Sequence, residues 1–186
     1  MSSTKRKEAR AALAQRAKYD FMDLPKRKHP RLKYYDYSSN GCYFVTICVK
    51  DRKNLLSSII VGRDAHIPPQ IELSAIGEIT NKYIRNIENV YDGVSIENCV
   101  IMPNHIHLLL LFYSSQSDDG GMKASRPTLH TIVRSLKTMV TKEIGYPIWQ
   151  DSYYEHVIQT EEGYLEAWQY IDENPLKYVL KKTGNL

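Results

Sequence analysis

The most constraining feature of this sequence is an almost unbroken apolar run over residues 105–112, which reads His-Ile-His-Leu-Leu-Leu-Leu-Phe. A strand with one face in water alternates apolar and polar residues, whereas a strand covered on both faces is apolar nearly throughout. The run therefore predicts a central β-strand with a packed layer on each side. Pro103-Asn104 directly before it is a turn signal, so the chain is expected to turn there.

The rest of the chain alternates strand and helix signals. β-branched and aromatic residues favour strands over residues 41–49 and 94–101, and a short extended segment is expected within residues 149–158. Apolar residues at helical spacing predict helices over residues 74–90, 128–144 and 161–174. The order β-α-β-β-α-β-α predicts an α+β fold, namely a ferredoxin-like (split βαβ) antiparallel sheet with an added C-terminal helix.

Two loops and one helix end are also expected. Residues 62–70, which contain Pro68-Pro69, and residues 114–126, which are rich in Gly and Asp, are typical of loops. Pro175 is expected to end the last helix, because the residue before a proline disfavours helical backbone geometry.

The positive charge of the chain is concentrated at its N-terminus. Residues 1–33 hold eleven Lys or Arg and three acidic residues, a net charge of +8, and the whole chain carries +4, so the remainder carries −4. We therefore divide the 186 residues into a basic, partly flexible arm, residues 1–33, and a single domain, residues 34–186. Such an arm suggests a polyanionic partner, although a solvated tail explains the charge equally well.

Neither a membrane span nor a signal peptide is evident in the sequence, so the cytoplasm is the expected compartment. The three cysteines, Cys42, Cys48 and Cys99, form no CxxC pair and are expected to be free thiols.

Two histidines stand out because they are two residues apart on the predicted central strand. His105 and His107 should therefore point to the same face, with Ile106 and Leu108 on the other. Two imidazoles so placed are able to bind one divalent ion. Two buried histidines that only hydrogen-bond to backbone carbonyls are the alternative, and the spacing alone favours that alternative.

One tyrosine of the last predicted helix lies away from its apolar stripe. The stripe is formed by Tyr164, Leu165, Trp168 and Ile171, and Tyr170 lies about 140° from its centre. The small neighbours of Tyr170 on the helix would leave one side of its ring open to a substrate. Asn174, one turn further on, would share the same surface. A surface tyrosine without a special role remains the simpler interpretation of this geometry.

Four blocks of the sequence together resemble a known family. Pro103-Asn104-His105-Ile106-His107 is similar to the HUH motif, in which two histidines flank a hydrophobic residue. Residues 34–48 resemble the first strand of IS200-like (Y1) transposases, and residues 153–158 and 170–175 resemble C-terminal blocks of their REP-associated tyrosine transposase branch. The HUH pattern alone is weak, but the four blocks in this order are specific, and the resemblance covers about residues 26–180.

The resemblance implies a metal-dependent enzyme, a DNA endonuclease and strand transferase. His105, His107 and Asn174 would bind Mg²⁺ or Mn²⁺, and Tyr170 would be the catalytic nucleophile. His156 and Gln159 would support the active site, and Gln159 stands where the branch often has an arginine.

The implied reaction nicks and rejoins single-stranded DNA at hairpin-forming, REP-like sequences through a 5′-phosphotyrosine intermediate. The implied location is the nucleoid, and both a monomer and a homodimer are compatible with the family. The cations expected to contact DNA are Lys26, Arg27, Lys28, Arg31, Lys33, Arg134 and Lys137.

Two other functions remain open from the sequence. A domesticated descendant that binds DNA or RNA hairpins without cutting them would keep the fold but not the reaction. A hydrolase in which His105 and His107 hold Zn²⁺ would need a further His or carboxylate ligand, and the sequence offers none in an obvious position.

Overall fold

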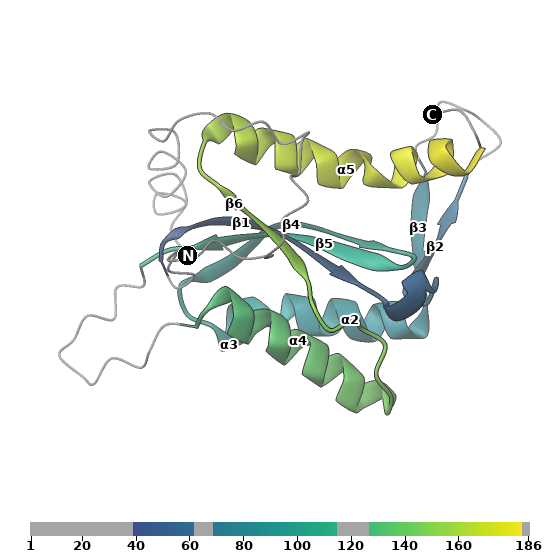
Figure 1. Ribbon diagram of the computed structural model, residues 1–186, viewed down its shortest axis with the longest axis horizontal. Coiled ribbons are helices and arrows are strands. Elements are labelled where there is room, and N and C mark those ends of the chain that lie inside the picture. Colours follow the sequence, from purple (N-terminus) through teal and green to yellow (C-terminus); the bar gives the residue numbers. More distant parts are fainter. Residues whose placement is uncertain (1–38, 62–68, 115–126, 184–186) are drawn as a thin grey trace.

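A four-stranded antiparallel sheet forms the centre of the molecule (Figure 1). The computed structural model describes residues 39–61, 69–114 and 127–183. The strands follow the spatial order β4-β5-β1-β6. Their bounds are β1 Gly41–Cys48, β4 Val94–Met102, β5 His105–Phe112 and β6 Tyr154–Ile158. The predicted central strand, β5, is hydrogen-bonded on both sides, and all its residues after His105 are buried.

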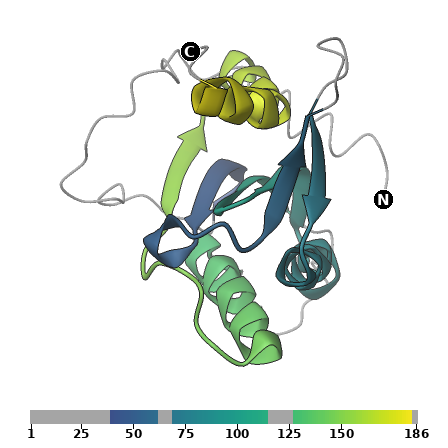
Figure 2. The same ribbon diagram turned by 90° about the vertical axis from the view of Figure 1, so that its right-hand side faces the viewer.

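Helices cover both faces of the sheet. α2 (Ala75–Arg85), α3 (Ile87–Val90) and α4 (Leu129–Ile144) lie on one face, and α5 (Glu161–Thr183) lies on the other (Figures 1 and 2). The hydroxyls of Ser74 and Thr128 cap α2 and α4 by accepting backbone N–H bonds, as expected for helix N-termini. The strand and helix order therefore confirms the predicted α+β, ferredoxin-like arrangement with an added C-terminal helix.

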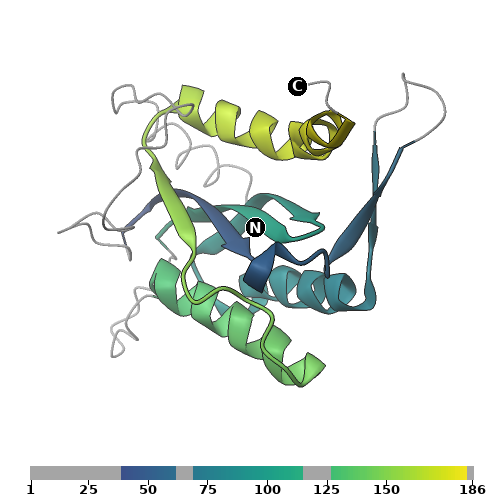
Figure 3. The same cartoon turned by 45° about the vertical axis from the view of Figure 1, so that its right-hand side comes forward.

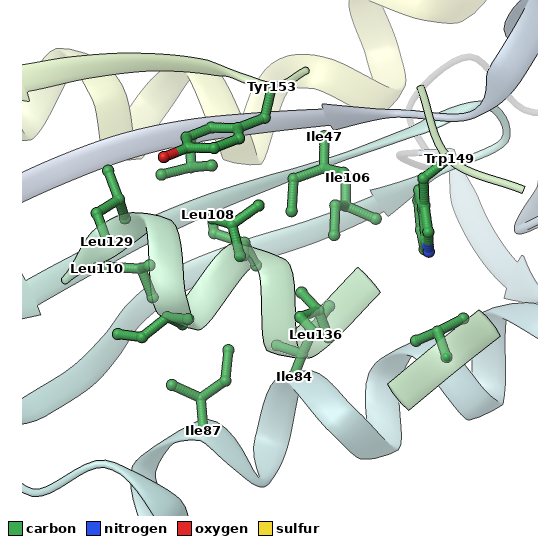
Figure 4. Close-up of a cluster of buried hydrophobic side chains, with 14 of the residues drawn as sticks. Ile47, Ile84, Ile87, Ile106, Leu108, Leu110, Leu129, Leu136, Trp149 and Tyr153 are labelled. Atoms are coloured by element: carbon green, nitrogen blue, oxygen red, sulfur yellow. The ribbon is translucent and has the colours of Figure 1, made fainter. Parts of the chain in front are cut away.

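Side-chain alternation along β5 divides the core into two clusters. Ile106, Leu108 and Leu110 pack toward α2 and α4, where they join residues such as Ile84 and Leu136 (Figure 4). The intervening residues of β5 point toward α5 and join the second cluster. The histidines share that second face, because the side-chain period of a strand is two.

A second, two-stranded sheet was not predicted. β2 (Ser57–Ile60) pairs with β3 (Gln70–Leu73). Gln70, the last residue of the loop expected over residues 62–70, therefore belongs to a strand. Figure 3 shows this hairpin rising beside the C-terminal half of α5. Ile59 and Ile71 of the hairpin pack against the same cluster as Tyr178 of α5.

The expectation that Pro175 ends the last helix is wrong. α5 continues through Pro175 to Thr183. A proline inside a helix removes one backbone hydrogen bond and costs about 3 kcal/mol. Packing of Tyr178 against the second cluster, beyond the proline, offsets that cost because it buries an aromatic ring.

The buried stripe of α5 also differs from the predicted one. Tyr164, Ala167, Ile171 and Asn174 are buried, whereas Leu165 is 59 % exposed. Ala167 is fully buried, so its small side chain allows the helix to approach the sheet closely. Within the described ranges, none of the helices combines the length and apolar character needed to cross a bilayer.

Candidate active site

The two histidines of β5 meet at their Nε2 atoms, beneath α5. The Nε2 atoms of His105 and His107 are 3.1 Å apart, and the planes of the rings are nearly perpendicular. His107 is 4 % exposed and His105 is half-buried. The strand therefore holds both imidazoles on one face with their outer nitrogens directed at one point.

The hydrogen bonds around Asn104 fix the tautomer of His105. The Asn104 Nδ2 donates to the backbone carbonyl of Arg52 at 3.3 Å, so Asn104 Oδ1 must be the atom 2.7 Å from His105 Nδ1. An amide oxygen only accepts, so His105 Nδ1 carries the proton. Its Nε2 consequently has a free lone pair, the form that binds a metal.

A hydroxyl supports the other histidine. Thr46, directly across from His107 on β1, places its Oγ1 2.8 Å from His107 Nδ1. A hydroxyl both donates and accepts. When the hydroxyl donates to Nδ1, His107 carries its proton on Nε2 and donates it to His105 Nε2. When the hydroxyl accepts from Nδ1, the Nε2 lone pairs of both histidines are free for an ion.

Burial keeps both imidazoles neutral at pH 7. It lowers the pKa of His105 to about 4, an effect that the charge of Arg52 increases and a hydrogen bond with Asn174 opposes. Burial lowers the pKa of His107 to about 3, and the charges of His105 and Arg52 act in the same direction. Neutral imidazoles are the form in which histidine ligates metals.

The ring of Tyr170 packs against one imidazole of the pair, that of His107. Its ring centroid is 5.4 Å from that of His107 and 5.7 Å from that of Phe44, both in edge-to-face geometry. The ring is half-buried, so Tyr170 packs on the sheet and does not point away from it as helical geometry predicted. α5 therefore brings the predicted nucleophile to the predicted metal ligands within a single chain.

Asn174 completes a donor set that suits a divalent ion. It is 8 % exposed and hydrogen-bonds with His105. Donors about 2.1 Å from an octahedral ion and at right angles to each other are about 3 Å apart, close to the observed Nε2 separation of 3.1 Å. Among the described residues, no three His, Cys, Asp or Glu side chains come together as a metal cluster. The Asn174 amide oxygen is therefore the group that could add a third protein ligand to the two imidazoles.

The remaining predicted site residues are distributed unequally around this centre. His156 of β6 pairs with Phe44 across the strands, so it shares the face of the site. Gln159 is exposed in the connection between β6 and α5.

The predicted DNA-binding cations lie away from this centre or outside the described residues. Arg134 and Lys137 lie on α4, which covers the opposite face of the sheet, and Lys137 donates to the carbonyls of Gln150 and Asp151. The predicted arm cations lie outside the described residues: Lys26, Arg27, Lys28, Arg31 and Lys33.

Sequence reasoning missed three residues that surround the imidazoles. Thr46 and Asn104 hold their Nδ1 atoms, and Arg52 contributes positive charge. Asn104 belongs to the turn signal and to the HUH-like block, but neither pattern predicts that its side chain hydrogen-bonds with His105. The position of Thr46 follows from the β1–β5 register, which no short motif encodes.

Two proteins of Haemophilus influenzae are similar in sequence to this chain. No protein-family model matches the chain. An uncharacterised protein of Haemophilus influenzae is 34% identical over 167 residues, 81% of this chain and 88% of that protein. A second H. influenzae protein, named "Putative REP-associated tyrosine transposase", is 26% identical over 159 residues, 77% of this chain and 74% of that protein.

A similar fold has been solved experimentally. The structure of a REP-associated tyrosine transposase bound to a REP hairpin superposes with a TM-score of 0.55 and 20% identity, covering 80% of this chain and 74% of that one. The chain therefore belongs to the same family as the 34%-identical H. influenzae protein, has the IS200-like (Y1) transposase fold, and is related to the REP-associated tyrosine transposases.

Proposed function

We propose that this chain nicks and rejoins single-stranded DNA through a covalent bond to Tyr170. The observation that carries the proposal is the edge-to-face contact of the Tyr170 and His107 rings, 5.4 Å between centroids. A tyrosine at the surface needs no such neighbour. The contact supports a catalytic role, because a phosphate held by His107 and the other proposed ligands would lie close to the phenol.

The roles of the ligands follow from their chemistry. His105, His107 and Asn174 would hold Mg²⁺ or Mn²⁺, with Thr46 and Asn104 orienting the imidazoles. Such an ion, when bound, neutralises charge on the phosphate oxygens and polarises phosphorus. All three ligands are neutral, so they leave the positive charge of the ion available to the phosphate.

The transfer step conserves the phosphodiester energy. The Tyr170 oxygen bonds to phosphorus in line with the departing 3′ oxygen, and the P–O3′ bond breaks. The phenol loses its proton and the 3′ oxygen gains one, which leaves a 5′-phosphotyrosine and a free 3′-OH. Because the new bond is again a phosphodiester, a 3′-OH reverses the step without ATP. A free tyrosine has a pKa of about 10, so loss of its proton needs an acceptor nearby.

A DNA hairpin with single-stranded flanks is the proposed substrate. The solved relative is bound to a REP hairpin, and the basic arm of this chain, residues 1–33, carries a net charge of +8 that favours binding to phosphate backbone. Tyr154 on the edge strand β6 is 58% exposed, and its cross-strand partner Thr46 is also the partner of His107. This exposed ring on the face of the site supports binding of single-stranded DNA, because unpaired bases stack on aromatic side chains.

Covalent capture tests the proposal. The full-length chain is incubated with Mn²⁺ and labelled DNA hairpins whose single-stranded flanks are randomised, then resolved on a denaturing gel. We expect a labelled adduct that requires Mn²⁺, disappears in Tyr170→Phe and persists in the matched control Tyr178→Phe on the same helix. Hairpin binding without an adduct would contradict the proposal and favour the non-catalytic binder. An adduct that survives in Tyr170→Phe would show that another residue is the nucleophile.

A further inference from the structure

The segment after β1 contains two strained backbone positions beside the proposed active site. Asp51 and Arg52 have φ angles of +56° and +54°, and they are the non-glycine residues with positive φ in the described part of the chain. The left-handed conformation costs about 1–2 kcal/mol for each L-residue that has a Cβ. Strain of this kind is concentrated at binding and catalytic sites, where the surrounding structure maintains it.

The Arg52 side chain, although exposed, reaches back to the end of β1. Its guanidinium hydrogen-bonds with the Cys48 thiol, and Cys48 is the cross-strand partner of His105. Directly paired residues share a face of the sheet and have Cβ atoms about 5 Å apart. The cation therefore lies on the α5 side of the sheet, next to the imidazole pair, and its positive charge reaches both rings.

The backbone of the same residue also orients one of the proposed ligands. The Arg52 carbonyl accepts the Asn104 Nδ2 hydrogen bond, which in turn fixes the Asn104 oxygen on His105 Nδ1. A change in the Lys50–Arg52 turn would therefore affect the cation and the His105 tautomer together. The strained turn and the proposed ligand His105 are thus connected through Asn104.

A fixed cation next to a metal site needs an anion to be favourable. By itself, the Arg52 charge repels a divalent ion at the histidines and weakens its binding. An anion between the two reverses the sign of the effect, because both positive charges then attract it. A guanidinium offers paired N–H donors that match two oxygens of a phosphate.

We propose that Arg52 binds a non-bridging oxygen of the DNA phosphate held at the His105–His107–Asn174 centre. The inference rests on the proposed function and adds a phosphate-binding residue to it. Arg52 and the metal would hold the phosphate from two sides, so that DNA and metal bind with positive coupling. The coupling, and not the affinity for either ligand alone, is the property that distinguishes this role from a structural one.

The test measures that coupling with a defined probe. Fluorescein-labelled single-stranded dT12 is titrated with the full-length chain with and without Mn²⁺, using fluorescence anisotropy. Mn²⁺ binding without DNA is measured in parallel from the free-ion electron paramagnetic resonance signal. The variants are Arg52→Gln, Arg52→Lys and the matched control Lys53→Gln, which removes an exposed neighbouring cation.

We expect Mn²⁺ to strengthen dT12 binding by the wild type, and Arg52→Gln to reduce this gain about tenfold, the size of one charged hydrogen bond. Arg52→Gln should bind Mn²⁺ alone at least as tightly as the wild type, and Arg52→Lys should recover part of the gain. Lys53→Gln should change binding equally with and without Mn²⁺. When dT12 is replaced by its uncharged methylphosphonate analogue, Mn²⁺ should no longer strengthen binding by the wild type or by any variant.

The contrary outcomes separate the inference from the proposed function. An unchanged Mn²⁺-dependent gain in Arg52→Gln would overturn the role of Arg52 and leave the metal site intact. Loss of Mn²⁺ binding in Arg52→Gln without DNA would assign Arg52 a structural role and overturn the inference too. A wild type that binds no Mn²⁺ would overturn the proposed function and, with it, the inference.

Discussion

The Tyr164 hydroxyl of α5 donates a 2.8 Å hydrogen bond to Oε2 of Glu97 on β4. Glu97 lies at an irregularity in the β4–β5 register, between Ile96 and Asn98, and its other carboxylate oxygen accepts from the Ser95 hydroxyl at 2.9 Å. The register shift thus directs a carboxylate toward the helix that carries the proposed nucleophile.

A second polar contact joins the same two elements. The Asn98 Nδ2 donates to Oδ1 of Asp172 at 2.9 Å. Tyr170 lies between Tyr164 and Asp172 along α5, so the two contacts flank it. The two contacts fix the position of α5 along β4. Apolar packing alone fixes this position less closely, because the hydrophobic effect has no preferred direction.

Removing the first contact should loosen α5 and slow the reaction. Tyr164→Phe leaves the partly buried Glu97 carboxylate with one donor fewer, which should cost about 1–3 kcal/mol in free energy of unfolding. Urea denaturation measures this loss, and single-turnover adduct formation should slow with little change in hairpin affinity. Tyr178→Phe is the control, because its hydroxyl makes only a 3.5 Å contact with Asn54. Equal effects of the two variants would contradict a special role for the Glu97 contact.

The Thr46 hydroxyl should control metal affinity. Thr46→Val removes the hydrogen-bond partner of His107 Nδ1 while keeping the shape of the side chain. Loss of such a support to a metal-binding histidine typically lowers metal affinity about 10–100-fold. Isothermal titration with Mn²⁺ measures the change, and Thr46→Ser should restore most of the affinity. If valine binds Mn²⁺ as tightly as threonine, the proposed role of the hydroxyl is wrong.

The buried imidazoles should make the metal-free protein lose stability in acid. Both folded pKa values, about 4 for His105 and about 3 for His107, are below the ordinary 6.5. Above pH 6.5 neither the folded nor the unfolded state protonates these groups, so their contribution is fully present. As the pH falls toward 3, the unfolded state gains protons that the folded state excludes, and stability declines.

A variant isolates that contribution. His107→Asn does not titrate and keeps an amide near Thr46. We expect urea denaturation between pH 7.5 and 4.5 in EDTA to give a flatter dependence of stability on pH for this variant than for the wild type. Parallel curves would mean that His107 does not contribute to the acid sensitivity.

Replacing the helical proline should stabilise the protein. Pro175→Ala restores a backbone N–H inside α5, where the wild-type helix lacks that donor. The gain in helix stability of up to about 3 kcal/mol is partly cancelled by the greater freedom of the unfolded chain, about 0.4–1 kcal/mol. We expect a net increase of about 1–2 kcal/mol in thermal or urea denaturation. A destabilised variant would mean that the proline is required by its packing.

The sequence predicted the elements of this fold well because their signals are local. The apolar run over residues 105–112 identified the central strand, and apolar residues at helical spacing predicted helices from residues 74 and 128, where the structure shows the N-caps Ser74 and Thr128. The end of α5 was missed because its continuation depends on Tyr178 packing near β2 and β3, which lie about a hundred residues earlier in the chain. No local pattern carries that information.

The site was predictable only in part for the same reason. His105, His107, Tyr170 and Asn174 belong to recognisable motifs, and the structure brings them together between β5 and α5. Helical geometry alone placed Tyr170 on the wrong face, because it assumed that Leu165 would be buried. The supporting residues come from the strand register and from a strained turn, neither of which a motif records.

Anomalous diffraction from a crystal soaked in Mn²⁺ tests the central claim most directly. The account predicts one strong Mn²⁺ peak within bonding distance of Nε2 of both His105 and His107 and of the Asn174 side chain, with the Tyr170 hydroxyl beside it. A peak bound elsewhere, or a Tyr170 hydroxyl far from the histidine-bound ion, would contradict it.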